Sequence, residues 1–126
     1  MIHVRAVVRG EPELPQTVRI FNYSKADEEI FFSSASAVEE KVRRKIRINV
    51  SEALVAYCAF IVRSVRAGER ATRIKEQSLK LLTEDSVMIG VPQSMRSISF
   101  EAKIDSRPAS KIELDCPIPA ASYTLA

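Results

Sequence analysis

An apolar run near the middle of the chain most constrains how it can fold. Residues 53–62 read ALVAYCAFIV and include no charged side chain. In a helix these side chains would surround the axis on every side, which is typical of a helix that protein covers all round. We therefore expect residues 53–62 to form a central helix on which the other elements pack.

Polar residues mark both ends of this helix. Ser51 can accept a hydrogen bond from the first helical turn, and Glu52 places negative charge near the positive end of the helix dipole. Arg63 and Arg66 lie in the last turn, and Gly68 can adopt the left-handed conformation that often ends a helix. The sequence predicts a helix that begins at Ser51 and stops at Gly68.

Three further helices are predicted. Ser24 can cap a helix over residues 25–44, with acidic residues early and basic residues late, the order that the helix dipole favours. Residues 71–82 have the spacing of an amphipathic helix. Thr83 offers an N-cap for a short helix over residues 84–88, which a glycine and a proline then close. Short turns between the central helix and the two helices that follow it predict a compact antiparallel array.

Two predicted hairpins flank the helices. Residues 2–8 and 16–22 alternate around a loop rich in glycine and proline, and residues 97–104 and 111–114 alternate around a second turn. The positions expected to carry the alternation are Val4, Ala6, Val8, Val18, Ile20 and Asn22 in the first hairpin and Ile98, Phe100, Ala102, Ile112 and Leu114 in the second. A lone hairpin is marginal in water, so we expect one antiparallel sheet, with pairing to a neighbouring subunit as the alternative.

Length and composition indicate one domain over residues 1–126, with an N-terminal hairpin (1–23), a helical core (24–92), a C-terminal hairpin (97–118) and a tail (119–126). No apolar run is long enough for a membrane span, and no secretory leader is recognised. We expect a cytoplasmic protein with an α+β fold: three long helices and one short helix with a small antiparallel sheet.

The sequence offers no catalytic or metal site of its own. His3 is its one histidine, and Cys58 and Cys116 are not at metal-ligand spacing. A serine or cysteine nucleophile would therefore lack its usual base, and Glu101 and Asp105 are interpreted as solvent-facing acids. We expect no nucleic-acid partner either, because the basic residues lie at helix ends and no stacking motif accompanies them.

Several segments together resemble the gamma subunit of bacterial urease. They are RKIRINVSEALVAYCAFIVRSVRAGE (44–69), LTEDSVMIGVP (82–92), SISFEAKI (97–104) and KIELDCPI (111–118), in the family's order and spacing. The chain departs from the family pattern at Lys45, usually glycine, at Ser51, usually proline, and at Asp115 and Cys116, usually His-Asp. Some twenty extra residues also precede the first helix.

The resemblance implies a noncatalytic gamma-type subunit of a urease or urease-like amidohydrolase. In that family a large alpha subunit holds two nickel ions and hydrolyses urea to ammonia and carbamate, so no cofactor or metal is expected in this chain. Alpha and beta subunits would be its partners. By apolar excess and position, the residues expected at the subunit interface are Leu54, Tyr57, Phe60, Ile61, Val87, Met88, Val91 and Pro92. The alternative is a stand-alone homo-oligomeric module derived from the same fold.

Overall fold

The computed structural model describes residues 2–11, 17–24 and 26–119. In chain order its elements are β1 (Ile2–Arg9), β2 (Thr17–Tyr23), α1 (Glu28–Arg43), α2 (Val50–Arg66), α3 (Ala71–Ser78), the 3₁₀ helix η1 (Glu84–Ser86), α4 (Val91–Ser94), β3 (Ser97–Ile104) and β4 (Ser110–Asp115). Helices and an antiparallel sheet are both present, so the α+β prediction is confirmed.

The two hairpins form a single four-stranded antiparallel sheet in the order β2-β1-β3-β4. The N-terminal hairpin therefore joins the C-terminal one, as expected. Ten apolar positions of β1, β3 and β4 lie on one face and are at most 3% exposed; they are Ile2, Val4, Ala6, Val8, Ile98, Phe100, Ala102, Ile104, Ile112 and Leu114. Mostly charged or polar residues, together with Val7, alternate with them on the outer face, as the period of two requires.

The register corrects the predicted alternation of β2. Asn22 pairs with His3 and is exposed, whereas Tyr23 pairs with Ile2 and contacts the Phe31 ring of α1, with ring centroids 4.9 Å apart. The helix-facing positions of β2 therefore include Tyr23, and the predicted set is offset by one residue. Side chains 17–21 lie outside the described residues.

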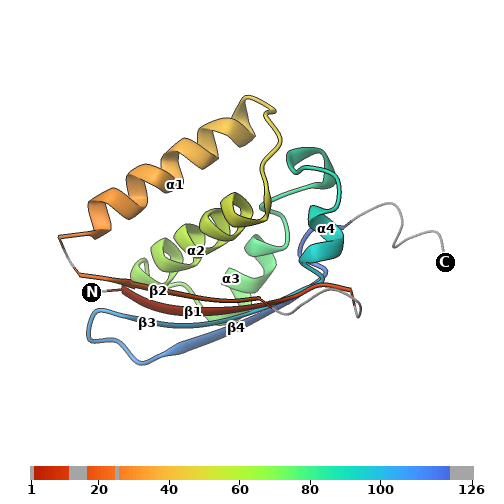
Figure 1. Cartoon of the computed structure of the whole chain (residues 1–126). Helices are drawn as coiled ribbons and strands as arrows, with labels where there is room; N and C mark the ends of the chain where they lie inside the picture. Colours follow the sequence, from red (N-terminus) through yellow and green to blue (C-terminus); the bar gives the residue numbers. More distant parts are fainter. Residues whose placement is uncertain (1, 12–16, 25, 120–126) are drawn as a thin grey trace.

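Helix α2 lies between α1 and the sheet, with α3 beside it (Figure 1). Eight of the ten residues in the apolar run are buried, and Val55 and Phe60 are partly buried against the same core. The prediction of a central helix is thus confirmed. The Tyr57 hydroxyl, enclosed in this core, donates a hydrogen bond to the Pro117 carbonyl at 3.4 Å, so its polar tip is partnered.

The start of α2 differs from the prediction. Its N-cap is Asn49, which has an extended backbone and accepts a hydrogen bond from the Glu52 amide at 2.8 Å. The Glu52 carboxylate accepts one from the Asn49 amide at 3.1 Å, which completes a capping box. Ser51 instead lies exposed inside the first turn, so the prediction that it caps the helix was wrong by two residues. Gly68, with φ of 79°, follows the helix as predicted.

Other helix ends also differ from the predicted positions. Asp27, rather than Ser24, is the N-cap position of α1, and the Ser24 hydroxyl donates to the Asp27 carboxylate at 2.7 Å. Helix α3 ends at Ser78 instead of residue 82, and Leu79–Leu81 continue as turns. The expected helix over residues 84–88 is the shorter η1. Gly90, with φ of 92°, precedes a further helical turn, α4, and Pro92 lies in the first turn of α4 instead of closing the preceding helix.

Arg66 ties three elements together at the C-terminal end of α2. Its guanidinium contacts the Glu28 carboxylate of α1 at 2.7 Å and the Asp105 carboxylate, in the turn after β3, at 3.1 Å. Hydrogen bonding to Arg66 lowers the pKa of Glu28 and holds the pKa of Asp105 at about 2. Arg107 in the same turn donates to the Val65 carbonyl, which fixes the turn against α2.

Replacing the observed cap should destabilise the fold. We expect Asn49→Ala to lower the free energy of unfolding by about 1 to 2 kcal/mol, because the Glu52 amide loses its acceptor. Ser51→Ala is the matched control and should change it by less than about 0.5 kcal/mol. Urea denaturation followed by circular dichroism measures both; equal losses would contradict the observed cap.

The Arg66 network should make stability depend on acid pH. A carboxylate with a lowered folded-state pKa contributes stability above its unfolded pKa, and this contribution is lost as the pH falls to the folded value. Arg66→Gln should therefore lower the melting temperature at pH 6, and the gap to the parent should narrow from about pH 5 to about pH 2. The control is Arg73→Gln, which removes an exposed ion pair with Glu69 within one helix turn. A gap that stayed constant with pH would contradict the assignment.

Candidate functional site

The structure places most of the predicted interface residues inside the chain's own core. Six of the eight are buried: Leu54, Tyr57, Ile61, Val87, Val91 and Pro92. Their side chains pack against other parts of the same chain and leave little area for another one. Phe60 is half-buried, and Met88 is 47% exposed. Phe60 and Met88 are therefore the two that retain surface for a contact.

Most of the large exposed apolar side chains lie on two segments that a backbone bridge joins. Among the described residues, four large hydrophobic side chains are exposed, and three of them are Ile46 (45%), Met88 (47%) and Ile89 (95%). We call these three residues the apolar end. The fourth, Ile30, lies near the start of α1. Met88 and Ile89 are neighbours in the chain and line the same hollow, which is more informative than a single exposed side chain, since isolated ones are normal on soluble proteins.

Backbone hydrogen bonds join the two segments of the apolar end. The Ile48 amide donates to the Ser86 carbonyl at 3.1 Å, and the Met88 amide donates to the Ile48 carbonyl at 2.9 Å. This parallel bridge between Ile48 and Val87 fixes the loop after η1 beside the segment before α2. The apolar end is thus presented on a constrained backbone.

The tip of the loop is itself a closed turn. The Val91 amide donates to the Met88 carbonyl at 3.2 Å, and Gly90 supplies the left-handed conformation that the turn needs. Ile89 occupies the tip with nearly all of its side chain in solvent. Beside it lies an open hollow of about 160 Å³, lined by Arg47, Met88, Ile89 and acidic residues of η1. The sequence predicts the loop over residues 84–92 as a partner contact but does not single out Ile89, although an isoleucine directly before a turn glycine could have signalled it.

A second apolar hollow lies where α1, α2 and the segment after α3 meet. Its volume is about 190 Å³, and its apolar lining consists of Val42, Ala56, Phe60, Leu81 and Leu82. Phe60 also lines an adjoining hollow toward α3, together with Ser64 and Ile74. Ala56, Phe60 and Ser64 are four residues apart on α2, so they follow one face of that helix.

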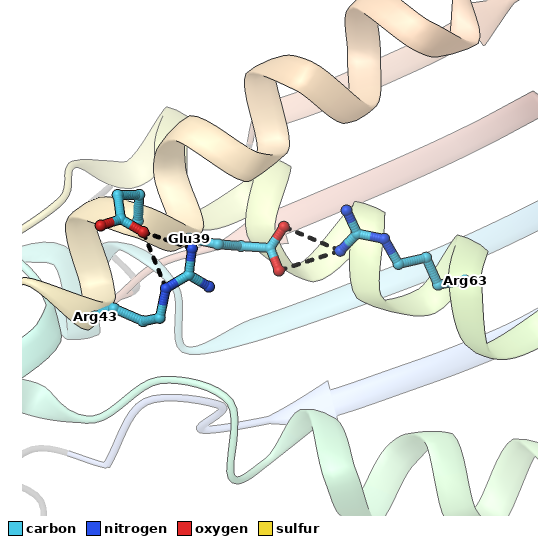
Figure 2. A network of polar contacts seen from close by, with 4 residues as sticks. Glu39, Arg43 and Arg63 are labelled. Carbon is cyan, nitrogen blue, oxygen red and sulfur yellow. Dashed lines mark hydrogen bonds and ion pairs between the residues drawn. The ribbon is translucent and has the colours of Figure 1, made fainter.

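Ion pairs rigidify the rim of this hollow. Figure 2 shows Glu39 of α1 pointing toward Arg63 of α2, whose guanidinium lies 3.0 and 3.1 Å from the two carboxylate oxygens. Arg63 also covers the Phe32 ring at 5.1 Å from its centroid, a cation–π contact. On the same side of α1, Arg43 pairs with Glu40 at 2.6 Å. The rim charges therefore neutralise one another.

Many basic residues at the helix ends are held in ion pairs of this sort. The pairs are Lys41–Glu52, Arg43–Glu40, Arg63–Glu39, Arg66–Glu28, Arg66–Asp105 and Arg73–Glu69. A nucleic-acid surface depends on cations that can release counterions from phosphates. Paired cations fit that role poorly.

The chemically reactive residue types are dispersed. His3 and Glu101 are exposed on the outer face of the sheet, and Asp105 is engaged by Arg66. Burial raises the pKa of the Cys58 thiol to about 12, so this thiol stays protonated at neutral pH. Cys116 is exposed and forms no disulfide.

Across the described ranges, no group of three or more histidine, cysteine, aspartate or glutamate side chains is arranged to hold a metal ion. Nor does any helix of this part of the chain have the length and apolar character needed to cross a membrane.

A sequence model described as urease, gamma subunit, matches residues 22–109. The match covers more than two thirds of the chain and includes α1, α2, α3, η1, α4 and β3. It leaves β1 and β4 outside, together with most of β2. The matched region contains the central helix and both segments of the apolar end. Because the match extends over more than two thirds of the chain, we conclude that this chain belongs to the urease gamma subunit family.

Proposed function

We propose that this chain is a noncatalytic, gamma-type structural subunit of a cytoplasmic urease or urease-like nickel amidohydrolase. Family membership supports the proposal. The observation that carries it is the apolar end, where Ile46, Met88 and Ile89 are exposed on a hydrogen-bonded backbone. Apolar side chains held in water this way favour association with another protein surface, because burial there removes them from water.

In this proposal the chemistry belongs to a partner alpha subunit. Nickel held by that subunit would activate water for attack on urea, which yields ammonia and carbamate. The chain described here contributes binding surface. Its apolar end would insert into the partner, and the hollow beside Phe60 offers a further apolar contact whose rim is already electrostatically neutral. Constrained side chains lose little entropy on binding, which favours such a role.

The second candidate is a stand-alone module that forms homo-oligomers without urease activity. The N-terminal hairpin favours it, because β1 and β2 lie almost entirely outside the family match and yet complete the sheet within one chain. A domain with a completed sheet needs less support from other subunits.

Affinity capture from the native host tests the proposal against this alternative. A tagged copy of the full chain is purified, and the captured material is analysed by mass spectrometry and metal analysis. Recovery of a large nickel-containing amidohydrolase chain is the expected result. Recovery of the chain alone, as a defined metal-free oligomer, would refute the subunit role and favour the second candidate.

A charge placed at the apolar end should prevent this association. We expect Ile89→Asp to reduce capture of the partner by more than about tenfold, because burying one isoleucine contributes about 1.5–3 kcal/mol and a buried carboxylate adds a desolvation cost. Ile30→Asp is the matched control, since Ile30 is also exposed but lies near the other end of α1. Both variants should keep the parent's melting temperature within a few degrees. Equal capture by both variants would place the interface elsewhere.

A further inference from the structure

One edge of β3 pairs with β1 of the same chain. β1 pairs with β3 over eight residue pairs, from Ile2 opposite Ile104 to Arg9 opposite Ser97. The inward side chains of β1 are 0 to 2% exposed, so they form part of the core and do not merely rest on it. A further backbone bond, from the Glu11 amide to the Gln93 carbonyl at 3.0 Å, holds the end of β1 near α4.

The family match covers β3 but not β1, the strand that pairs with it. β3 lies within the region that matches the urease gamma family, whereas β1 lies wholly outside it. β3 pairs with β4 along its other edge. Without β1, the matched region would therefore present a row of backbone donors and acceptors beside an open apolar face, which is a template for another strand.

The acceptor edge has a selective shape. Ala6, the smallest inward side chain of β1, pairs with Phe100, the largest inward side chain of β3. Val4 likewise pairs with the small Ala102, whereas Ile2 and Val8 pair with the larger Ile104 and Ile98, so large meets small in the middle of the edge. A one-residue slip would turn these apolar side chains outward, and the register is therefore strongly specified.

Charged side chains on the outer face of the sheet favour the same register. Arg5 pairs with Glu101, and Glu101 pairs in turn with Lys111 of β4, so opposite charges lie beside one another across three strands. Such cross-strand pairs stabilise one alignment over its alternatives. Side-chain size on the inner face and charge on the outer face thus both favour the same alignment of β1 along β3.

We propose that the β3 edge is a strand-binding site. Its ligand class is an extended peptide with apolar side chains at alternate positions, a small one opposite Phe100 and a cation opposite Glu101. β1 fills the site within the chain and thereby supplies what would otherwise require a strand from a second chain. This inference goes beyond the proposed function and does not depend on it.

Cleavage of the folded chain tests the site directly. A protease recognition sequence is placed between Glu11 and Thr17 of the full chain, and the protein is cut after folding. The N-terminal fragment should stay bound during gel filtration. When the cut protein is refolded from denaturant with an excess of labelled peptide of residues 2–9, the peptide should replace the fragment with 1:1 stoichiometry, as native mass spectrometry measures.

Two single substitutions in the peptide provide a matched pair. Val4→Lys places a charge on the inner face, where the parent side chain is fully buried, and should weaken binding by more than about a hundredfold. Val7→Lys makes the same change on the outer face, near Glu101 and Glu113, and should bind about as well as the parent peptide.

Either of two results would overturn the proposal. The first is loss of the fragment while the remainder keeps the near-ultraviolet circular dichroism and melting temperature of the uncut protein. The second is equal binding of the two substituted peptides. The capture experiment affects neither fragment retention nor peptide binding. The strand-binding proposal and the subunit proposal can therefore be refuted independently.

Discussion

The burial of α2 on all sides is the constraint on which the rest of the structure depends. Its apolar run has no charged residue to turn toward water, so α1, α3 and the sheet must all cover it. Each large aliphatic side chain removed from water contributes about 1.5–3 kcal/mol, so the buried side chains of this helix are a substantial source of core stability. The charges sit at its two ends. Lys41–Glu52 ties its start to α1, and Arg66 ties its last turn to α1 and to the turn after β3.

This arrangement separates two kinds of apolar residue that look alike in the sequence. Leu54, Tyr57 and Ile61 belong to α2 and are covered by the chain itself, whereas Met88 and Ile89 lie on a loop that the same core holds in place. The bridge between Ile48 and Val87 is the physical link, because it joins the segment entering α2 to that loop. A stable interior and a presented apolar surface therefore arise from one set of contacts.

The sequence predicted what depends on the pattern of side chains and failed where backbone geometry decides. The central helix and the two hairpins follow from apolar periodicity, and the turn glycine at position 68 follows from the conformational freedom of glycine; all were confirmed. Ser51 and Asn49 are both good capping residues, and only the extended backbone at Asn49 selects it. Likewise, an excess of apolar residues predicts burial but does not indicate whether the same chain or a partner buries them. Most of the expected interface residues lie in the chain's own core.

The N-terminal hairpin bears on both functional candidates through the same physical argument. An open β3 edge would be a template for pairing with an extended strand of matching pattern, and a subunit with such an edge would depend on its partner for folding as well as for function. With β1 in place, the sheet side is completed and its outer face carries alternating charges. In the proposed assembly, association with another protein would fall to the apolar end and to the hollow beside Phe60, where apolar area is still exposed. A sheet completed within one chain favours folding before assembly, which fits both the proposed subunit and the alternative module that functions alone.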